Sequence, residues 1–267
     1  MRVSKNPDSA GARSPLVLLI PALAGVCFLA LPLIAIPIKT PWAVLVDELG
    51  SPRARTALVL SLETATAATI VSTVLGVPLA WLLARTNFPG RRMLRVFVAL
   101  PLVLPPVAGG LSLLLAYGRR GVVGHVLWQL TGLGLPFTTP GVVVAETFVA
   151  MPFLVISVEG ALRSISPRYE AIAATLGAGR WFTFRSVTLP MVAPGIFAGA
   201  LLCWARALGE FGATITFAGS FPGTTQTMPL EIYLAFQDDP SAAVALSFVL
   251  LVVSAGVLSA LRKRWWI

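Results

Sequence analysis

The sequence predicts an all-α integral membrane protein with six transmembrane helices in a single domain. Of its 267 residues, 57% are hydrophobic and only 12% are charged, whereas soluble domains carry about 25% charged residues. Apolar segments of about twenty residues, long enough to cross a bilayer as helices, alternate with arginine-rich segments. The net charge of +9 lies mainly between the apolar segments, so we interpret it as a topology signal rather than a nucleic-acid surface.

The expected spans share high hydropathy and are each at least twenty residues long, and they lie at about 16–38, 56–84, 96–117, 140–162, 191–218 and 242–261. Together they define one transmembrane domain over 16–262, preceded by a polar cytoplasmic arm (1–15) and followed by a basic and aromatic membrane anchor (263–267). The first apolar segment exceeds the 7–15-residue core of a signal peptide, which favours a retained span.

The second and third spans carry features that lipid does not favour. Hydroxyl side chains recur along the second span and prefer a helix–helix interface or a wet cavity. The third span contains Pro101, Pro105, Pro106 and Gly109, so its freed backbone groups need protein or water as partners. We therefore expect the second span inside the bundle and the third buried in protein or beside a pathway.

The fourth and fifth spans contain the intramembrane charges. Glu146 and Glu159 lie near the two ends of the fourth span, where we expect them to reach the interfaces. In the fifth span, Gly195-x-x-x-Gly199 permits close helix packing. Arg206 and Glu210 follow at i, i+4 and should face the bundle interior or a cavity. Two interpretations of this pair remain open: it locks helices together, or it contacts a transported substrate.

A polar stretch, residues 163–190, interrupts the apolar chain between the fourth and fifth spans. Ser166 and Pro167 are typical of a helix start, and Gly177 is typical of a helix end. Between them, apolar side chains recur at helical spacing, at Tyr169, Ile172, Ala173 and Leu176. Such a helix fits either a groove on another protein or the membrane surface.

Charge asymmetry predicts the orientation of the chain. With both termini in the cytoplasm, cytoplasmic segments hold fourteen of the twenty Lys and Arg residues. Because positive residues concentrate on the cytoplasmic side, residues 163–190 are expected there too.

Several classes of function find no support in the residues. Cys27 and Cys203 suggest no disulfide framework and no metal site, and no Gly-Lys pair is present to form a phosphate-binding P-loop. His125 stands alone in a loop, and no set of catalytic residues lies at membrane depth, so an enzyme is not expected. A passive channel or scaffold remains open at this point.

The spacing within the polar stretch resembles the signature loop of permease subunits of bacterial ABC importers. That signature reads Glu-Ala-Ala, three residues, Gly, nine residues, Ile-x-Leu-Pro, and here Gly177, Val187, Leu189 and Pro190 keep its spacing. Glu170 departs from it by one residue, with Ala171 at the usual glutamate position. The resemblance implies a type I importer permease fold whose cytoplasmic coupling helix, between spans four and five, docks on an ATPase. It assigns this docking to Tyr169, Glu170, Ala171, Ile172, Ala173, Ala174, Leu176, Gly177, Val187, Leu189 and Pro190.

A second resemblance narrows the choice of the transported substrate. Glu170-Ala-Ile-Ala-Ala-Thr-Leu-Gly-Ala-Gly-Arg-Trp181 and Ala205-Arg-Ala-Leu-Gly-Glu-Phe-Gly-Ala-Thr-Ile-Thr-Phe-Ala-Gly219 are similar to permease subunits of molybdate importers. The sulfate and thiosulfate permeases share Ala-Arg-x-x-Gly-Glu but usually diverge around Ala213 to Phe217. Tungstate remains an alternative because it is hard to separate from molybdate.

The resemblance also implies partners and a mechanism. Two copies of the chain would enclose one path in the bacterial inner membrane, driven by two cytoplasmic ATPase subunits that use ATP and Mg²⁺. A periplasmic or lipid-anchored protein would deliver the oxyanion, and the chain itself would hold no cofactor. We expect the path and its gate at the broken third span and the end of the fifth: Pro105, Pro106, Gly109, Arg206, Glu210, Gly212 and Thr214.

Overall fold

The computed structural model describes residues 16–262, which form helices and no strand. In chain order the elements are α1 (Leu16–Lys39), α2 (Trp42–Gly50), α3 (Pro52–Arg85), α4 (Arg91–Val103), α5 (Pro106–Tyr117), α6 (Gly124–Thr131), α7 (Thr139–Ser164), α8 (Arg168–Thr175), α9 (Arg180–Thr183), the π-helical turn η1 (Phe184–Thr188), α10 (Leu189–Leu208), α11 (Gly212–Ala218), α12 (Met228–Asp238) and α13 (Pro240–Arg262). The predicted N-terminal arm and C-terminal anchor lie outside the described residues.

Five of the described stretches are long and apolar enough to cross a membrane: most of α1, α3, α7, the run from α9 through α10, and most of α13. They correspond to five of the six predicted spans. The predicted third span, 96–117, is not one helix, because α4 ends at Val103 and α5 begins at Pro106. Proline lacks an N–H donor and disfavours helix in the residue before it, so Pro105 and Pro106 break the helix. The twelve residues of α5 reach only about 18 Å, against about 30 Å of hydrocarbon.

The fifth predicted span is also shorter than expected, since α10 ends at Leu208 and α11 begins at Gly212. The segments expected as loops between spans contain helices of their own, namely α2, α6 and α12. In α2, for example, the apolar side packs on α13, with the rings of Trp42 and Phe248 5.3 Å apart. Tertiary packing therefore orders segments whose sequence indicated only a polar connection.

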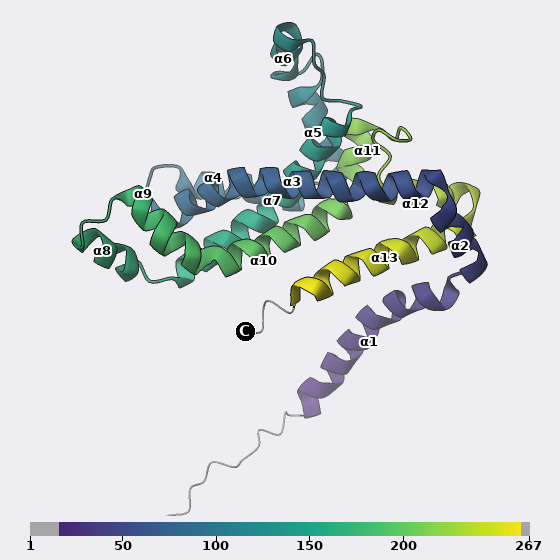
Figure 1. The fold of residues 1–267 in the computed structure, drawn as a ribbon, viewed down its shortest axis with the longest axis horizontal. Coiled ribbons are helices and arrows are strands. Elements are labelled where there is room, and N and C mark those ends of the chain that lie inside the picture. Colours follow the sequence, from purple (N-terminus) through teal and green to yellow (C-terminus); the bar gives the residue numbers. More distant parts are fainter. Residues whose placement is uncertain (1–15, 263–267) are drawn as a thin grey trace, which may run out of the picture.

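The core of the bundle is formed by α3, α7 and α10, which lie side by side in Figure 1. Small residues make the close approach possible. A side-chain carbon at Gly195 would meet Ala161 of α7, and one at Gly199 would lie 2.9 Å from the Cβ of Ser157. This confirms the predicted close packing of the fifth span.

The second predicted span lies inside the bundle, as expected. Its hydroxyl-bearing residues Ser61, Thr64 and Ser72 in α3 are buried. At one end of the core, α8 and α9 lie together, whereas α2 and α12 lie at the opposite end (Figure 1). The helix α1 packs along α13. The bundle therefore has two distinct ends, one of which carries the polar stretch 163–190.

Candidate functional site

The polar stretch folds into α8, a tight turn, α9 and η1. Gly177 adopts φ +83°, and the turn carries paired hydrogen bonds of 3.0 Å from Gly177 N to Ala174 O and from Ala178 N to Ala173 O. This pair of hydrogen bonds, together with a left-handed glycine, is the Schellman motif of helix ends. It confirms the predicted end of the helix. The start lies one residue later than predicted, with the Ser166 hydroxyl accepting a hydrogen bond from Arg168 N at 3.3 Å.

One face of α8 exposes large apolar side chains. Tyr169, Ile172 and Leu176 are 51%, 48% and 82% exposed, and Trp181 and Phe182 of α9 are also exposed. Ala171 and Ala174 are exposed as well, whereas Ala173 is partly buried. A group of exposed apolar side chains on this scale marks a surface that contacts a partner or lipid.

Glu170 lies on the opposite side of α8 and ties it to the bundle. Its Oε1 is 3.2 Å from Nε of Arg85, at the end of α3, and accepts a 3.0 Å hydrogen bond from the Thr188 hydroxyl in η1. Arg85 also donates to the carbonyl of Ile165, at 3.1 Å, just before α8. Glu170 therefore holds α8 against two other elements, a role the sequence left undefined.

The second half of the signature forms the connection into α10. Val187 lies in η1 and is partly buried, Leu189 packs on the core at the start of α10, and Pro190 occupies the first turn. These three residues join the exposed loop to a spanning helix and do not lie on the exposed face of α8.

The two acidic residues of the fourth predicted span behave differently from one another. Glu159 lies at the end that carries α8 and is 2.7 Å from both Arg95 and Arg163. Glu146 was expected at the opposite interface, but this prediction is wrong. Its side chain is only 1% exposed and accepts a 2.9 Å hydrogen bond from the Thr64 hydroxyl of α3. It points into the bundle because α3 packs along that part of α7.

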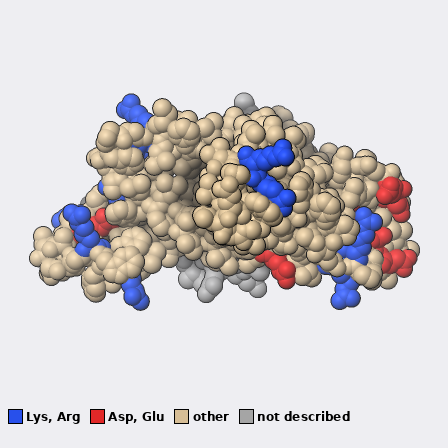
Figure 2. Space-filling model, turned by 90° about the horizontal axis from the view of Figure 1, so that it is seen from above, with Lys and Arg blue, Asp and Glu red and all other residues tan. Residues whose placement is uncertain are grey.

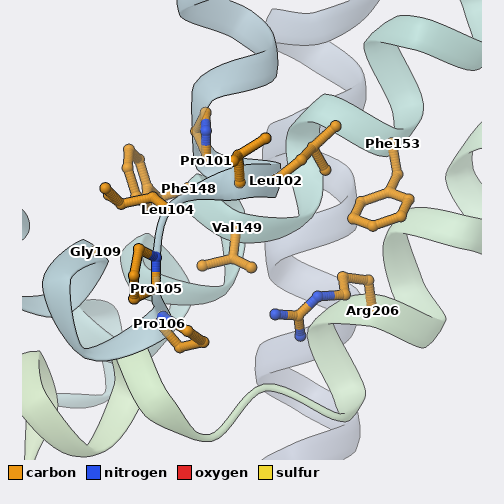
Figure 3. Close-up of a pocket in the computed structure, with 11 residues that line it drawn as sticks. Pro101, Leu102, Leu104, Pro105, Pro106, Gly109, Phe148, Val149, Phe153 and Arg206 are labelled. Carbon is orange, nitrogen blue, oxygen red and sulfur yellow. The ribbon is translucent and has the colours of Figure 1, made fainter.

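The two helix breaks meet at a cavity of about 270 Å³ (Figure 3). Its lining comes from the end of α4, the start of α5, the middle of α7 and the end of α10, and consists of Pro101, Leu102, Val103, Leu104, Pro105, Pro106, Gly109, Phe148, Val149, Phe153 and Arg206. Four of the seven predicted path residues are in this set: Pro105, Pro106, Gly109 and Arg206. The wall from α7 was not predicted, since Phe148, Val149 and Phe153 are ordinary apolar residues of a spanning helix and give no signal of a cavity.

Of the remaining predicted path residues, Glu210 and Gly212 lie next to the cavity and Thr214 does not reach it. Glu210 is 2.6 Å from Arg206 and accepts a 2.8 Å hydrogen bond from Ala213 N at the start of α11. A side chain added at Gly212 would collide with Pro106, so α11 and α5 touch through their backbones. Thr214 is fully buried in α11.

The described residues hold no group of three or more His, Cys, Asp or Glu side chains that could bind a metal ion. What the geometry offers instead is an exposed apolar helix at one end of the bundle and a small cavity with one guanidinium at the two helix breaks. The first suits docking of a partner, and the second suits passage or binding of a small anion.

Residues 76–266 match the family model of the binding-protein-dependent transport system inner membrane component. The chain therefore belongs to this family of ABC transporter permeases, as the signature spacing predicted. It is 50% identical to the molybdenum transport system permease protein ModB of Mycobacterium tuberculosis, over 92% of each chain. It is 40% identical to that of Escherichia coli K12, over 78% of this chain and 91% of the relative.

The fold is that of ABC importer permeases. The crystal structure of a bacterial alginate ABC transporter in complex with an alginate pentasaccharide-bound periplasmic protein contains a similar chain. The TM-score is 0.74 at 19% identity, covering 93% of both chains. Together with the five apolar stretches, this defines a multi-pass membrane protein.

Proposed function

We propose that the chain is the transmembrane subunit of an ATP-driven importer and forms the translocation path for molybdate. The observation that carries this proposal is the 50% identity to the molybdenum transport permease of Mycobacterium tuberculosis over 92% of both chains. The family match, residues 76–266, also covers both α8 and the cavity.

In this proposal residues 16–262 form one domain that crosses the inner membrane six times, with α4 and α5 together as one interrupted span. Both termini, α8 and α9 are cytoplasmic. The charges support this orientation, because in Figure 2 the charged side chains at the end that carries α8 and α9 are mainly Lys and Arg, whereas acidic and basic side chains are mixed at the opposite end.

The exposed face of α8 is the proposed coupling surface. Tyr169, Ile172 and Leu176 would enter a groove on a cytoplasmic ATPase subunit, which binds the ATP and Mg²⁺, and this chain would need no cofactor of its own. Two permease copies and two ATPases form the complex, since one chain encloses only half of a path. An oxyanion-binding protein docks on segments 118–139 and 219–241.

The contacts of α8 indicate how its movement reaches the path. When the ATPases close on ATP, each α8 is displaced, and Glu170 passes the displacement to Arg85 of α3. The π-helical turn η1 passes it to α10, whose last turn carries Arg206 beside the cavity. The path then opens outward, receives the oxyanion and closes again on ATP hydrolysis.

Binding to an ATPase distinguishes this proposal from a passive channel. A tagged chain purified with the candidate ATPase of its own organism should retain it, and Ile172→Glu on the exposed face of α8 should lose it. Leu130→Glu, in α6 and 79% exposed at a distant segment, is the matched control and should retain the ATPase. A chain that never retains an ATPase would contradict the proposal.

Competition between oxyanions for uptake identifies the preferred substrate. In the reconstituted complex, labelled molybdate uptake should be reduced by excess unlabelled molybdate or tungstate and much less by sulfate or thiosulfate. Stronger competition by sulfate or thiosulfate than by molybdate would reassign the substrate within the same class of tetrahedral oxyanions.

A further inference from the structure

The guanidinium of Arg206 has more hydrogen-bond donors than the described chain uses. Its side chain is 29% exposed, and its one described polar contact joins Nη2 to Oε2 of Glu210 at 2.6 Å. A guanidinium carries five N–H donors, and an arginine that only locks helices typically engages a carboxylate through two parallel bonds. Figure 3 shows the guanidinium of Arg206 pointing toward the other residues that line the cavity.

The cavity gives these donors an unusual environment. All its other lining residues are apolar or glycine, and Pro101, Pro105 and Pro106 have no backbone N–H to offer an anion. Arg206 is therefore the one charged residue in the lining. A volume of about 270 Å³ holds roughly nine water molecules at about 30 Å³ each, which suits a small oxyanion with part of its hydration shell.

The two carboxylate oxygens of Glu210 contact different groups. Oε1 accepts a hydrogen bond from Ala213 N at 2.8 Å, and Oε2 contacts Arg206. The side chain is only 1% exposed, so the backbone contact fixes the carboxylate beside the guanidinium. The charge of Arg206 is thereby offset in this conformation, although the guanidinium remains accessible from the cavity.

We propose, on the basis of the function proposed above, that Arg206 is the oxyanion contact of the path and that Glu210 is a built-in competitor for it. An oxygen of the passing anion replaces Oε2 of Glu210 on the guanidinium, and Oε2 returns when the anion leaves. A permeation site must bind strongly enough for the ion to enter and weakly enough for it to leave. The carboxylate keeps the site weak without removing its charge.

The helix contacts tie this competition to the conformation of the path. Arg206 belongs to α10, whereas Glu210 is bonded to the first turn of α11. Because α11 touches α5 where Gly212 meets Pro106, movement of these two helices relative to α10 shifts the carboxylate relative to the guanidinium. Opening of the path can thus change how far Glu210 neutralises Arg206.

The test uses the complete transporter in proteoliposomes, with two readouts: ATP-driven uptake of labelled molybdate, and equilibrium binding of labelled molybdate to the permease–ATPase complex without the binding protein. Arg206→Gln should lower uptake about tenfold or more, because a charged hydrogen bond to the anion is lost. Glu210→Gln keeps an oxygen for Ala213 N and removes the competing charge. It should tighten binding about tenfold and lower maximal uptake several-fold, because release slows.

The matched control is Arg55→Gln, which removes an exposed arginine of α3 that does not line the cavity. Uptake and binding should stay within about twofold of the unmodified transporter, since an exposed charge outside the path contributes little. A second variant, Arg206→Lys, keeps the charge without the planar fork. Its uptake should lie between that of Arg206→Gln and that of the unmodified chain.

The results separate this inference from the function on which it rests. Unchanged uptake by Arg206→Gln, or unchanged or weaker binding by Glu210→Gln, would overturn the anion contact while leaving the importer intact. Equal uptake by Arg206→Lys and Arg206→Gln would also overturn it, because charge at this position would then be irrelevant. Absence of molybdate uptake by the unmodified complex would instead contradict the proposed function itself, and this inference with it.

Discussion

Arg85 at the end of α3 lies 3.2 Å from Glu170 on the inner side of α8, and the same carboxylate oxygen accepts a hydrogen bond from Thr188. A spanning helix, the exposed helix and the turn that begins α10 therefore meet at one carboxylate. The Arg85 side chain is only 10% exposed, so solvent screens this contact less than it screens an ordinary surface pair. This arrangement makes Glu170 a link for movement between α8 and the bundle.

Loss of this link should uncouple transport from ATP hydrolysis. Glu170→Gln or Arg85→Gln is expected to weaken the attachment of α8 by about 1.5 kcal/mol, which is roughly tenfold in the equilibrium constant for attachment. Molybdate taken up per ATP hydrolysed should fall several-fold in proteoliposomes. The loss in the double variant should be smaller than the sum of the two single losses, since both substitutions remove the same contact. Additive losses would show that the two residues act separately.

The left-handed turn after α8 should tolerate few side chains. Gly177 has φ +83° with open space around it, so a substitution there costs conformational energy alone. Gly177→Val should cost about 1–2 kcal/mol and reduce coupled uptake, whereas Gly177→Asn, which tolerates this conformation, should reduce it less. Gly179→Val is the matched control, since Gly179 has φ −67° and equally open surroundings. Equal effects at the two glycines would contradict the role of the turn.

The buried carboxylate of Glu146 should depend on its donor from α3. Thr64→Val leaves Glu146 without that hydrogen bond and is expected to lower the free energy of unfolding by about 1–3 kcal/mol. The control is Thr73→Val, because the Thr73 hydroxyl bonds only a carbonyl of its own helix, that of Thr69. Thermal unfolding of the detergent-purified chain measures both. A larger loss from the control would refute this account of Glu146.

The contact between α10 and α7 should not accept an added methyl group. In Gly199→Ala the new carbon lies 2.9 Å from the Cβ of Ser157 and 3.2 Å from the carbonyl oxygen of Leu154, so we expect a loss of about 1–3 kcal/mol. Gly160→Ala, on α7 with open space around it, should be neutral or slightly stabilising. The same unfolding measurement compares them, and similar midpoints for the two variants would argue against close packing at Gly199.

Features set by local chemistry could be predicted from the sequence. The helix end at Gly177 follows from the glycine and from the helical spacing of the apolar residues before it. The interruption of the third span follows from its prolines. The close packing at Gly195 and Gly199 needs only the absence of side chains. In each case the cause lies within a few residues of its effect.

Features set by contacts between distant segments could not be predicted. The role of Glu170 depends on Arg85, from a different helix, and the cavity depends on side chains of α7 such as Phe148 and Phe153. Glu146 was misplaced for the same reason. Its position near the start of a span indicated an interface, but the neighbouring helix α3 buries that part of α7 and supplies a hydrogen bond.

In the proposed function, this chain carries molybdate across the membrane when an ATPase drives it. The most direct test is uptake of labelled molybdate into proteoliposomes that contain the chain, its ATPase and its oxyanion-binding protein. Labelled molybdate should accumulate in the proteoliposomes only when both ATP and the binding protein are present. Its accumulation should fall at least tenfold in Arg206→Gln. Uptake that proceeds equally without ATP, or no uptake of molybdate under any of these conditions, would contradict the proposed function.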